Sequence, residues 1–155
     1  MATTKEFRKK AAQKFYETFC PDRIAEVDFI DFNYSVRDIS IEAGTTLCGF
    51  KDPRVSPDKT TFFTQHGIPV VILGVHDQTK LPTHPRIFSK VMNVYEVLVP
   101  VPHALESVCA DGIDSWSLLE IPVQVGGGGW QYKIPEPHRY LRYVPDSERG
   151  IPARR

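Results

Sequence analysis

The segment Gly126-Gly127-Gly128-Gly129-Trp130-Gln131-Tyr132-Lys133-Ile134-Pro135 carries the strongest signal in the chain. A run of glycines lets the backbone turn sharply and approach another group closely. The residues that follow it are strand-like, and a polar Gln131 stands between two aromatic residues. The segment therefore predicts a tight turn leading into a strand, with one amide side chain at the mouth of that strand.

A glycine run is also found in phosphate-binding loops, but the residues after this one argue against such a loop. A P-loop needs Gly-Lys-Ser/Thr before a helix, and a dinucleotide-binding fold opens a helix at its last glycine. Here Pro135 and Pro137 follow, and a helix interior does not accommodate proline. From the residues alone two interpretations stay open: a hairpin turn with an incidental Gln131, or a turn that places Gln131 in a site.

The composition indicates one globular domain over residues 1–155. The formal net charge is zero, which argues against a nucleic-acid partner, because such binders usually carry a basic excess. No apolar run reaches membrane-spanning length, so no membrane span is expected. The N-terminus lacks the apolar core of a signal peptide, so we expect export by another route or within a larger secreted polypeptide.

The cysteines and histidines give no metal or disulfide pattern. The three cysteines are widely spaced and form no CxxC pair, which favours buried thiols in a reducing compartment. The five histidines are scattered and show no HxxxH or HExxH spacing. We therefore expect no metal and no cofactor.

The pattern along the chain predicts an α+β fold with a β-rich core of short strands. Thr4 is a suitable N-cap for a helix over residues 4–18, the core spans about 27–145, and residues 146–155 are expected to form a mobile tail. Residues 103–109 are expected to be helical or irregular. Strands are expected at 28–31, 33–41, 45–50, 60–65, 70–75, 86–100, 116–125, 131–134 and 140–143.

Three groups of side chains suit a nucleotide. Lys51 and Arg54 supply a cation for phosphate, Phe62 and Phe63 supply an aromatic platform for a base, and Gln131 supplies an amide for ribose hydroxyls.

Arg86 could add a second phosphate contact, and each of these groups has a plainer alternative. Charged residues in a loop such as that around Lys51 and Arg54 are usually solvated. One of two adjacent strand residues, such as Phe62 and Phe63, usually faces the core. Arg86 could equally be a surface or ion-paired residue.

Three segments resemble the NAD(P)+ glycohydrolase toxin domains, which include the tuberculosis necrotising toxin and NADase effectors of type VI secretion. Residues 40–47, Ser-Ile-Glu-Ala-Gly-Thr-Thr-Leu, are similar to the strand and glycine turn before their active-site loop. Residues 60–67, Thr-Thr-Phe-Phe-Thr-Gln-His-Gly, resemble their aromatic segment. Residues 126–135 resemble their GGGxQ[YF]xxP segment, which is the most specific of the three.

The resemblance implies an ADP-ribosyltransferase-like fold and assigns roles to residues of this chain. Gln131 would be the catalytic residue, in the place that many ADP-ribosyltransferases give to Glu. The substrate-binding residues would be Lys51 or Arg54 and Arg86 at the phosphates, Phe62 or Phe63 near the nicotinamide, and Gly128, Gly129 and Trp130 beside the amide. The chain departs from the family pattern at Cys48–Lys51, where many relatives carry Arg or Tyr. It also has a fourth glycine and a bulky Trp130.

The function implied by the resemblance is hydrolysis of NAD+ or NADP+ at the nicotinamide–ribose bond, by an interbacterial effector that acts in the cytoplasm of a target cell. Nicotinamide leaves as a neutral molecule, so the protein's task is to position the substrate and stabilise a cationic ribose. A cognate immunity protein is the expected partner. The alternatives are an ADP-ribosyltransferase toxin, a non-catalytic binding module and a nuclease, for which no His or Lys constellation is evident.

Overall fold

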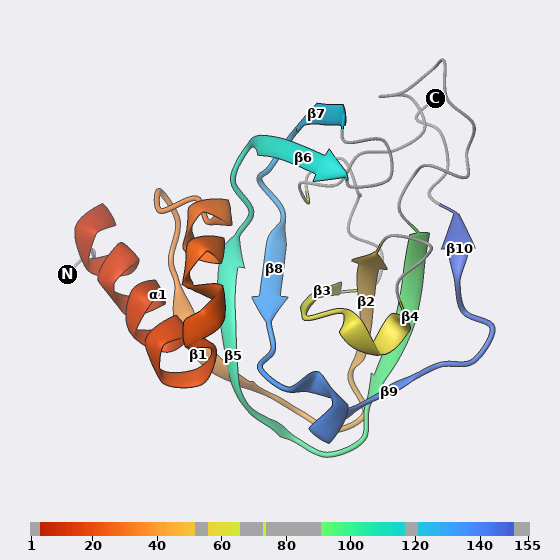
Figure 1. The fold of residues 1–155 in the computed structure, drawn as a ribbon. Helices are drawn as coiled ribbons and strands as arrows, with labels where there is room; N and C mark the ends of the chain where they lie inside the picture. Colours follow the sequence, from red (N-terminus) through yellow and green to blue (C-terminus); the bar gives the residue numbers. More distant parts are fainter. Residues whose placement is uncertain (1–3, 52–55, 66–72, 74–90, 117–120, 151–155) are drawn as a thin grey trace.

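The computed structural model describes residues 4–51, 56–65, 73, 91–116 and 121–150. An N-terminal helix and a 3-10 helix lie beside a sheet of antiparallel strands, and a small two-stranded arm projects from one end of that sheet (Figure 1). The elements are α1 (Lys5–Phe19), η1 (Pro21–Phe29), β1 (Arg37–Ile41), β2 (Thr46–Lys51), η2 (Pro57–Lys59), β3 (Phe62–Gln65), β4 (Val91–Val97), β5 (Val101–Val108), β6 (Gly112–Trp116), β7 (Ile121–Val125), β8 (Trp130–Lys133), η6 (Pro137–Arg139), β9 (Leu141–Tyr143) and β10 (Arg149–Gly150).

The helix α1 begins and ends where its sequence predicts. The Thr4 side chain accepts a hydrogen bond from the Phe7 backbone N–H over 3.1 Å, which satisfies one donor of the first turn. Cys20 is the C-cap, and the next residue is Pro21, which starts η1. The buried side of the helix is carried by Ala12, Phe15 and Tyr16. Phe7, in the first turn of the helix, is exposed.

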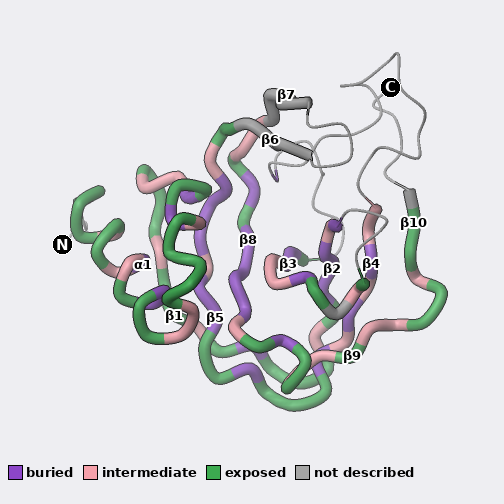
Figure 2. Tube along the Cα trace, viewed as in Figure 1, coloured by how far each residue is buried: buried purple, intermediate pink, exposed green. Residues whose placement is uncertain are grey.

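The large sheet has the strand order β1-β5-β8-β3-β2-β4-β10, with β9 also paired to β4. All of its strand pairs are antiparallel. One side, here called the core face, bears a cluster drawn from β1, β2, β3, β4, β5 and β8, so the sheet curls around it. Its buried members are Ile41, Leu47, Phe63, Tyr95, Val97, Val101, Ala104, Tyr132 and Ile134. Burial runs along β2, β4, β5 and β8 (Figure 2).

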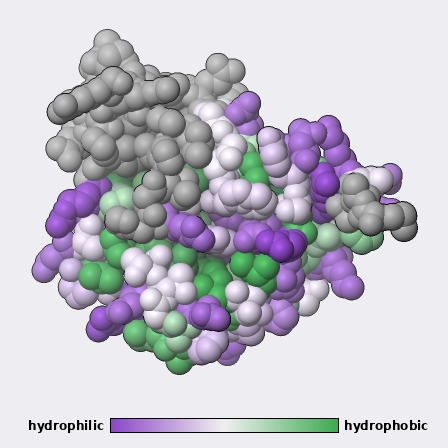
Figure 3. All heavy atoms as spheres, turned by 180° about the vertical axis from the view of Figure 1, so that it is seen from behind, coloured by the Kyte–Doolittle hydropathy of each residue, from purple (hydrophilic) through white to green (hydrophobic). Residues whose placement is uncertain are grey.

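The other side, here called the helix face, is covered by α1 and η1 at β5. Leu105 of β5 packs there with Ala12, Phe15, Tyr16, Val27 and Ile30. A second cluster thus attaches the N-terminal layer to the sheet. Seen from behind, hydrophobic residues gather across the lower middle of the molecule, among hydrophilic residues that dominate its margins (Figure 3).

Three predicted elements were wrong. Residues 28–31 belong to η1 and to an isolated bridge between Ile30 and Cys109, because Pro21 starts a helical turn. Residues 103–109, expected to be helical or irregular, fall almost wholly within β5. The two sides of β5 face different hydrophobic clusters, so its sequence lacks the alternation of apolar and polar residues that indicates a half-buried strand. Residues 116–125 are not one strand, because β6 and β7 pair as a hairpin.

Other elements agree in place and differ in length. The strands β2, β3, β8 and β9 lie where strands were expected, whereas β1 begins only at Arg37. Of the strand expected at 86–100, residues 86–90 lie outside the described residues, and β4 ends at Val97. The strand expected at 70–75 lies outside the described residues except for Leu73. In the segment expected to be a tail, β10 pairs with β4 at Met92 and Val91. Among the described residues, no helix has both the length and the apolar character needed to cross a membrane.

Candidate active site at the start of β8

The glycine run folds back on the end of β5. Gly128 N donates to the Cys109 carbonyl over 2.8 Å, and Cys109 N donates to the Gly129 carbonyl over the same distance. Gly127 N donates to the Asp111 carboxylate over 2.6 Å. The run therefore closes the base of the β6–β7 arm and delivers the chain into β8.

Two glycines of the run are required by geometry. A Cβ at Gly127 would lie 2.1 Å from the Cys109 carbonyl oxygen and 2.4 Å from the Ala110 carbonyl carbon. Gly128 has a φ of +107°, a conformation that residues with a Cβ rarely adopt. The glycines thus serve a close backbone crossing, and the resulting turn sets the position of Gln131.

The Gln131 side chain lies on the helix face of β8 and is 7% exposed. Its Nε2 donates to the Phe29 carbonyl at the end of η1 and to Ser107 Oγ on β5, each over 3.4 Å. The Phe29 carbonyl also accepts from Ala110 N over 2.9 Å. The amide is thus held between η1 and β5.

These contacts decide which way the Gln131 amide points. A backbone carbonyl can only accept a hydrogen bond, so the atom that faces Phe29 must be the NH₂ group. Both hydrogen bonds between the Gln131 side chain and described residues are donated by Nε2, so Oε1 accepts none from those residues. The side chain therefore presents an acceptor oxygen, which suits a hydroxyl donor such as a ribose.

The strand register separates two predicted site residues from Gln131. Tyr132 pairs with Phe63, and Phe63 pairs with Gly49, so all three lie on the core face. Lys51 is two residues from Gly49 and lies on that face as well, 3.0 Å from Glu148 through its ammonium. Gln131 adjoins Tyr132 and therefore lies on the opposite face.

Phe63 contributes to the core, where its ring meets Tyr95 edge-on with centroids 5.0 Å apart. Phe62 lies on the helix face with Gln131, opposite Lys133 in the register. The Lys133 ammonium is 4.7 Å from the Phe62 ring centroid, close enough for a cation–π contact. Of the two predicted phenylalanines, the structure thus brings Phe62 to the face of Gln131.

Trp130, which precedes Gln131, is partly exposed, with 39% of its surface accessible. Its carbonyl accepts a hydrogen bond from Thr64 Oγ1 over 3.0 Å, and Thr64 is itself buried. The backbone pairing of β3 with β8 ends at Phe63 and Tyr132, and the Thr64 side chain continues the contact by one residue. This bond fixes the backbone on which Gln131 is mounted.

Arg54 and Arg86, the other predicted phosphate contacts, lie outside the described residues. The predictions missed Ser107, Thr64 and Lys133, all buried beside Gln131 or on its face. Only Lys133 carried a signal, because a residue two positions along a strand shares the face of its neighbour. Among the residues that the structure places, no group of three or more His, Cys, Asp or Glu side chains could hold a metal ion.

The acidity of two groups near the site is changed by their surroundings. Burial, and secondarily the Asp111 carboxylate, raise the pKa of the Cys109 thiol to about 11. Burial, and secondarily Glu106, raise the pKa of Tyr132. Both groups stay neutral near pH 7, so neither is a ready nucleophile or base.

Comparison with known proteins indicates the fold. No protein-family model and no curated protein matches the chain. One chain of the structure of Tse6 in complex with Tsi6 superposes with a TM-score of 0.64 at 20% identity, covering 94% of this chain and 99% of that one. A chain of Rhs1-CT in complex with the immunity protein RhsI1 gives a TM-score of 0.49 at 16% identity, covering 77% and 84%. The first of these likenesses shows a shared α+β fold.

Proposed function

We propose that this chain is an NAD(P)+ glycohydrolase toxin domain with an ADP-ribosyltransferase-like fold. The observation that carries the proposal is the Gln131 amide, oriented by the Phe29 carbonyl so that Oε1 is presented as an acceptor. The fold shared with a chain of the structure of Tse6 in complex with Tsi6 is compatible with the proposal. The resemblance of residues 126–135 to the toxin motif supports it independently.

The proposed reaction breaks the bond between C1′ of ribose and the nicotinamide nitrogen. The electron pair of that bond goes to the pyridinium ring, so nicotinamide leaves neutral and needs no acid. The ribose develops oxocarbenium character, as in glycoside hydrolysis. Water then bonds to C1′ and loses a proton to solvent, giving ADP-ribose or its 2′-phosphate.

An amide at position 131 suits this chemistry better than a carboxylate does. Gln131 Oε1 can accept a hydrogen bond from a ribose hydroxyl, while Nε2 satisfies the Phe29 carbonyl. A carboxylate at position 131 would place an oxygen that only accepts hydrogen bonds against the Phe29 carbonyl oxygen, which is also an acceptor, so no hydrogen bond would form there. The role assigned to Gln131 is therefore to position the ribose, without proton transfer.

The test is incubation of the purified chain with NAD+ and with NADP+, followed by chromatography of nicotinamide and ADP-ribose. Gln131→Ala should lose activity by at least about a hundredfold, on the scale of a lost positioning contact. Gln65→Ala is the matched control, because the Gln65 amide bonds Tyr132 Oη on the core face. Full activity in Gln131→Ala would remove Gln131 from the site.

The same assay separates the alternative, an ADP-ribosyltransferase. Transfer of ADP-ribose to a macromolecule in excess of free ADP-ribose would replace hydrolysis by transfer as the function. As an effector, the chain would act in the cytoplasm of a target bacterium, as part of a larger secreted polypeptide. A cognate immunity protein that neutralises the chain is the partner that this function implies.

A further inference from the structure

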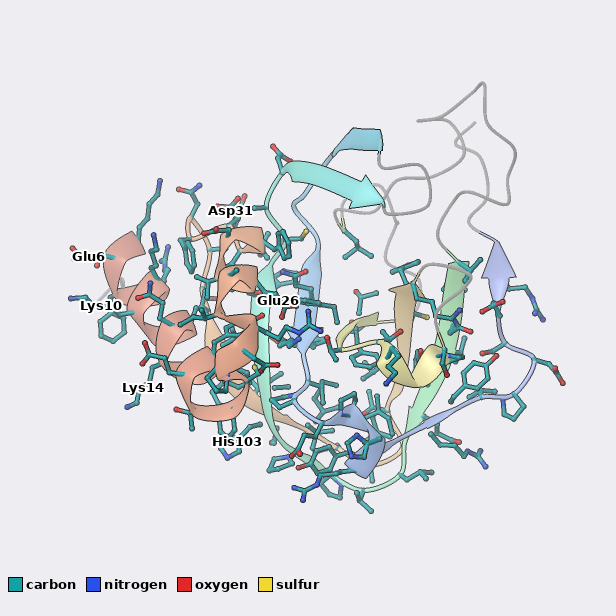
Figure 4. All side chains as sticks on the ribbon, viewed as in Figure 1. Glu6, Lys10, Lys14, Glu26, Asp31 and His103 are labelled. Carbon is teal, nitrogen blue, oxygen red and sulfur yellow. The ribbon has the colours of Figure 1, made fainter. Side chains whose placement is uncertain are left out.

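Two contacts of different kinds join η1 to β8. The Phe29 carbonyl meets the Gln131 amide, and the Glu26 carboxylate lies 2.7 Å from the Lys133 ammonium. Glu26 and Phe29 are three residues apart in η1, and Gln131 and Lys133 are two residues apart in β8. The two contacts between η1 and β8 therefore lie next to each other. Glu26 lies on the side of η1 that faces β5 and β8 (Figure 4).

The Lys133 side chain is held by residues at the start of β3. The side chain is 4% exposed, and its ammonium donates to Thr61 Oγ1 over 2.7 Å. The Phe62 ring lies beneath the ammonium, 4.7 Å from it. Because Thr61 and Phe62, at the start of β3, hold the Lys133 ammonium in place, its position in the sheet constrains where the Glu26 carboxylate can lie.

The Glu26 carboxylate in turn defines where η1 lies. Its side chain is 17% exposed, and it lies close enough to Tyr16 of α1 that burial together with this carboxylate raises the pKa of the tyrosine. Burying an ion pair of this kind adds little net stability, since desolvation offsets the attraction, but it can specify one arrangement. A short non-α helix needs such a constraint, because η1 contains a non-helical kink at Arg23.

We propose that Lys133 and Glu26 are a positioning pair for Gln131. Their ion pair sets η1 so that the Phe29 carbonyl holds Nε2 and leaves Oε1 for the substrate. Neither residue touches the substrate in this account. The catalytic consequence rests on the proposed function, whereas the effect on the amide does not.

The experiment uses isotope-labelled full-length chain and the side-chain NH₂ resonances of Gln131 in its NMR spectrum. They are assigned by their disappearance in Gln131→Ala. Lys133→Met and Glu26→Gln should each shift these resonances and speed exchange of the proton that faces Phe29. The control is Glu96→Gln, which removes a carboxylate from the exposed Glu96–Arg142 pair of equal 2.7 Å length between β4 and β9. It should leave the resonances unchanged.

Kinetics with NAD+ supply the second measurement. Both variants should lower kcat by roughly tenfold or more with KM changed less than about twofold, because an amide out of place costs transition-state positioning. A fall in kcat with an unchanged amide spectrum would overturn the proposal. If a single variant fails to fold, the double variant Glu26→Gln/Lys133→Met removes both buried charges, and an unchanged amide in that protein would equally overturn it. Wild-type chain that turns over neither dinucleotide would refute the proposed function, while the amide spectrum would still decide the pairing.

Discussion

The Gln131 amide and the Phe29 carbonyl, 102 residues apart in sequence, meet over 3.4 Å at the junction of β8 and η1. This contact fixes the identity of the side chain, because only a donor can face a carbonyl. The resemblance in sequence puts Gln131 where many ADP-ribosyltransferases carry Glu, and the geometry of η1 gives a physical reason for Gln in this chain.

Gln131→Glu should therefore be more damaging than its small change in size suggests. The variant loses the donor to Phe29 and buries a charge beside an acceptor, so we expect a loss of about 1–3 kcal/mol in unfolding free energy near pH 8. Burial raises the pKa of the introduced carboxyl above its unfolded value. Its protonated form can donate to the carbonyl, so stability should recover as the pH falls to about 5. Denaturant titrations at both pH values test this, and equal losses at both would contradict it.

Gly127→Ala should destabilise the chain at the base of the β6–β7 arm. The added Cβ would meet the Cys109 carbonyl and the Ala110 backbone, neither of which can move as a flexible side chain does. Overpacking of this kind costs typically about 1–3 kcal/mol. Gly112→Ala is the control, because a Cβ there meets nothing within 4 Å, and it should stay within about 0.5 kcal/mol of wild type. Equal effects in thermal or urea unfolding would refute the close-crossing account.

Thr64→Val should weaken the support of Gln131. The variant keeps the shape of the buried side chain but removes the hydrogen bond to the Trp130 carbonyl, at a cost of about 1–2 kcal/mol. NAD+ turnover should fall with it, since the backbone of Gln131 follows Trp130. Thr18→Val, which removes an exposed hydroxyl bond to the Lys14 carbonyl, is the control. Unaltered stability and turnover in Thr64→Val would show that the bond has no supporting role.

The three cysteines should differ in reactivity. Cys109 is buried with a pKa of about 11, so only about one thiol in a thousand is ionised near pH 8. Cys48 is buried as well, whereas Cys20 is partly exposed. Iodoacetamide labelling followed by mass spectrometry should modify Cys20 first and the other two only on unfolding. Early labelling of Cys109 would contradict the burial described.

The raised pKa of Cys109 also predicts an alkaline limit to stability. The folded-state pKa lies above the ordinary value of 9.0, so the stabilising contribution is present below pH 9 and is lost as the pH rises to about 11. Melting temperatures across this range should therefore fall less steeply in Cys109→Ala than in wild type. Parallel curves would assign the alkaline loss to other groups.

Local signals in the sequence predicted several elements correctly. Thr4 caps the start of α1, and Pro21 follows its C-cap. Both signals can be read from the sequence because a cap and a proline affect the backbone only within about one helical turn. The β-branched and aromatic runs of β2 and β3 predicted strands, since their pattern is read from adjacent residues. The glycine run predicted a turn into β8 with Gln131 near its start, as observed.

Other features depend on which segments lie over which face. The strand β5 was missed because both of its faces are covered: Leu105 packs against the helices and Ala104 packs in the core-face cluster. Apolar residues therefore stand at consecutive positions, and the alternation of apolar and polar residues that indicates a half-buried strand is absent. Lys51 suited a phosphate site by charge, yet the register β8–β3–β2 carries it to the face opposite Gln131.

The sequence by itself determined the class of the fold, the N-terminal helix and the amide at the glycine turn, because those depend on propensity and spacing within short segments. Only the tertiary structure decided the partners of that amide, namely Phe29 and Ser107, and the pairing of Lys133 with Glu26. The physical reason is that a strand's alternation assigns side chains to two faces without saying what covers either. That choice is made by the pairing of strands distant in sequence and by the packing of η1 on β5 and β8.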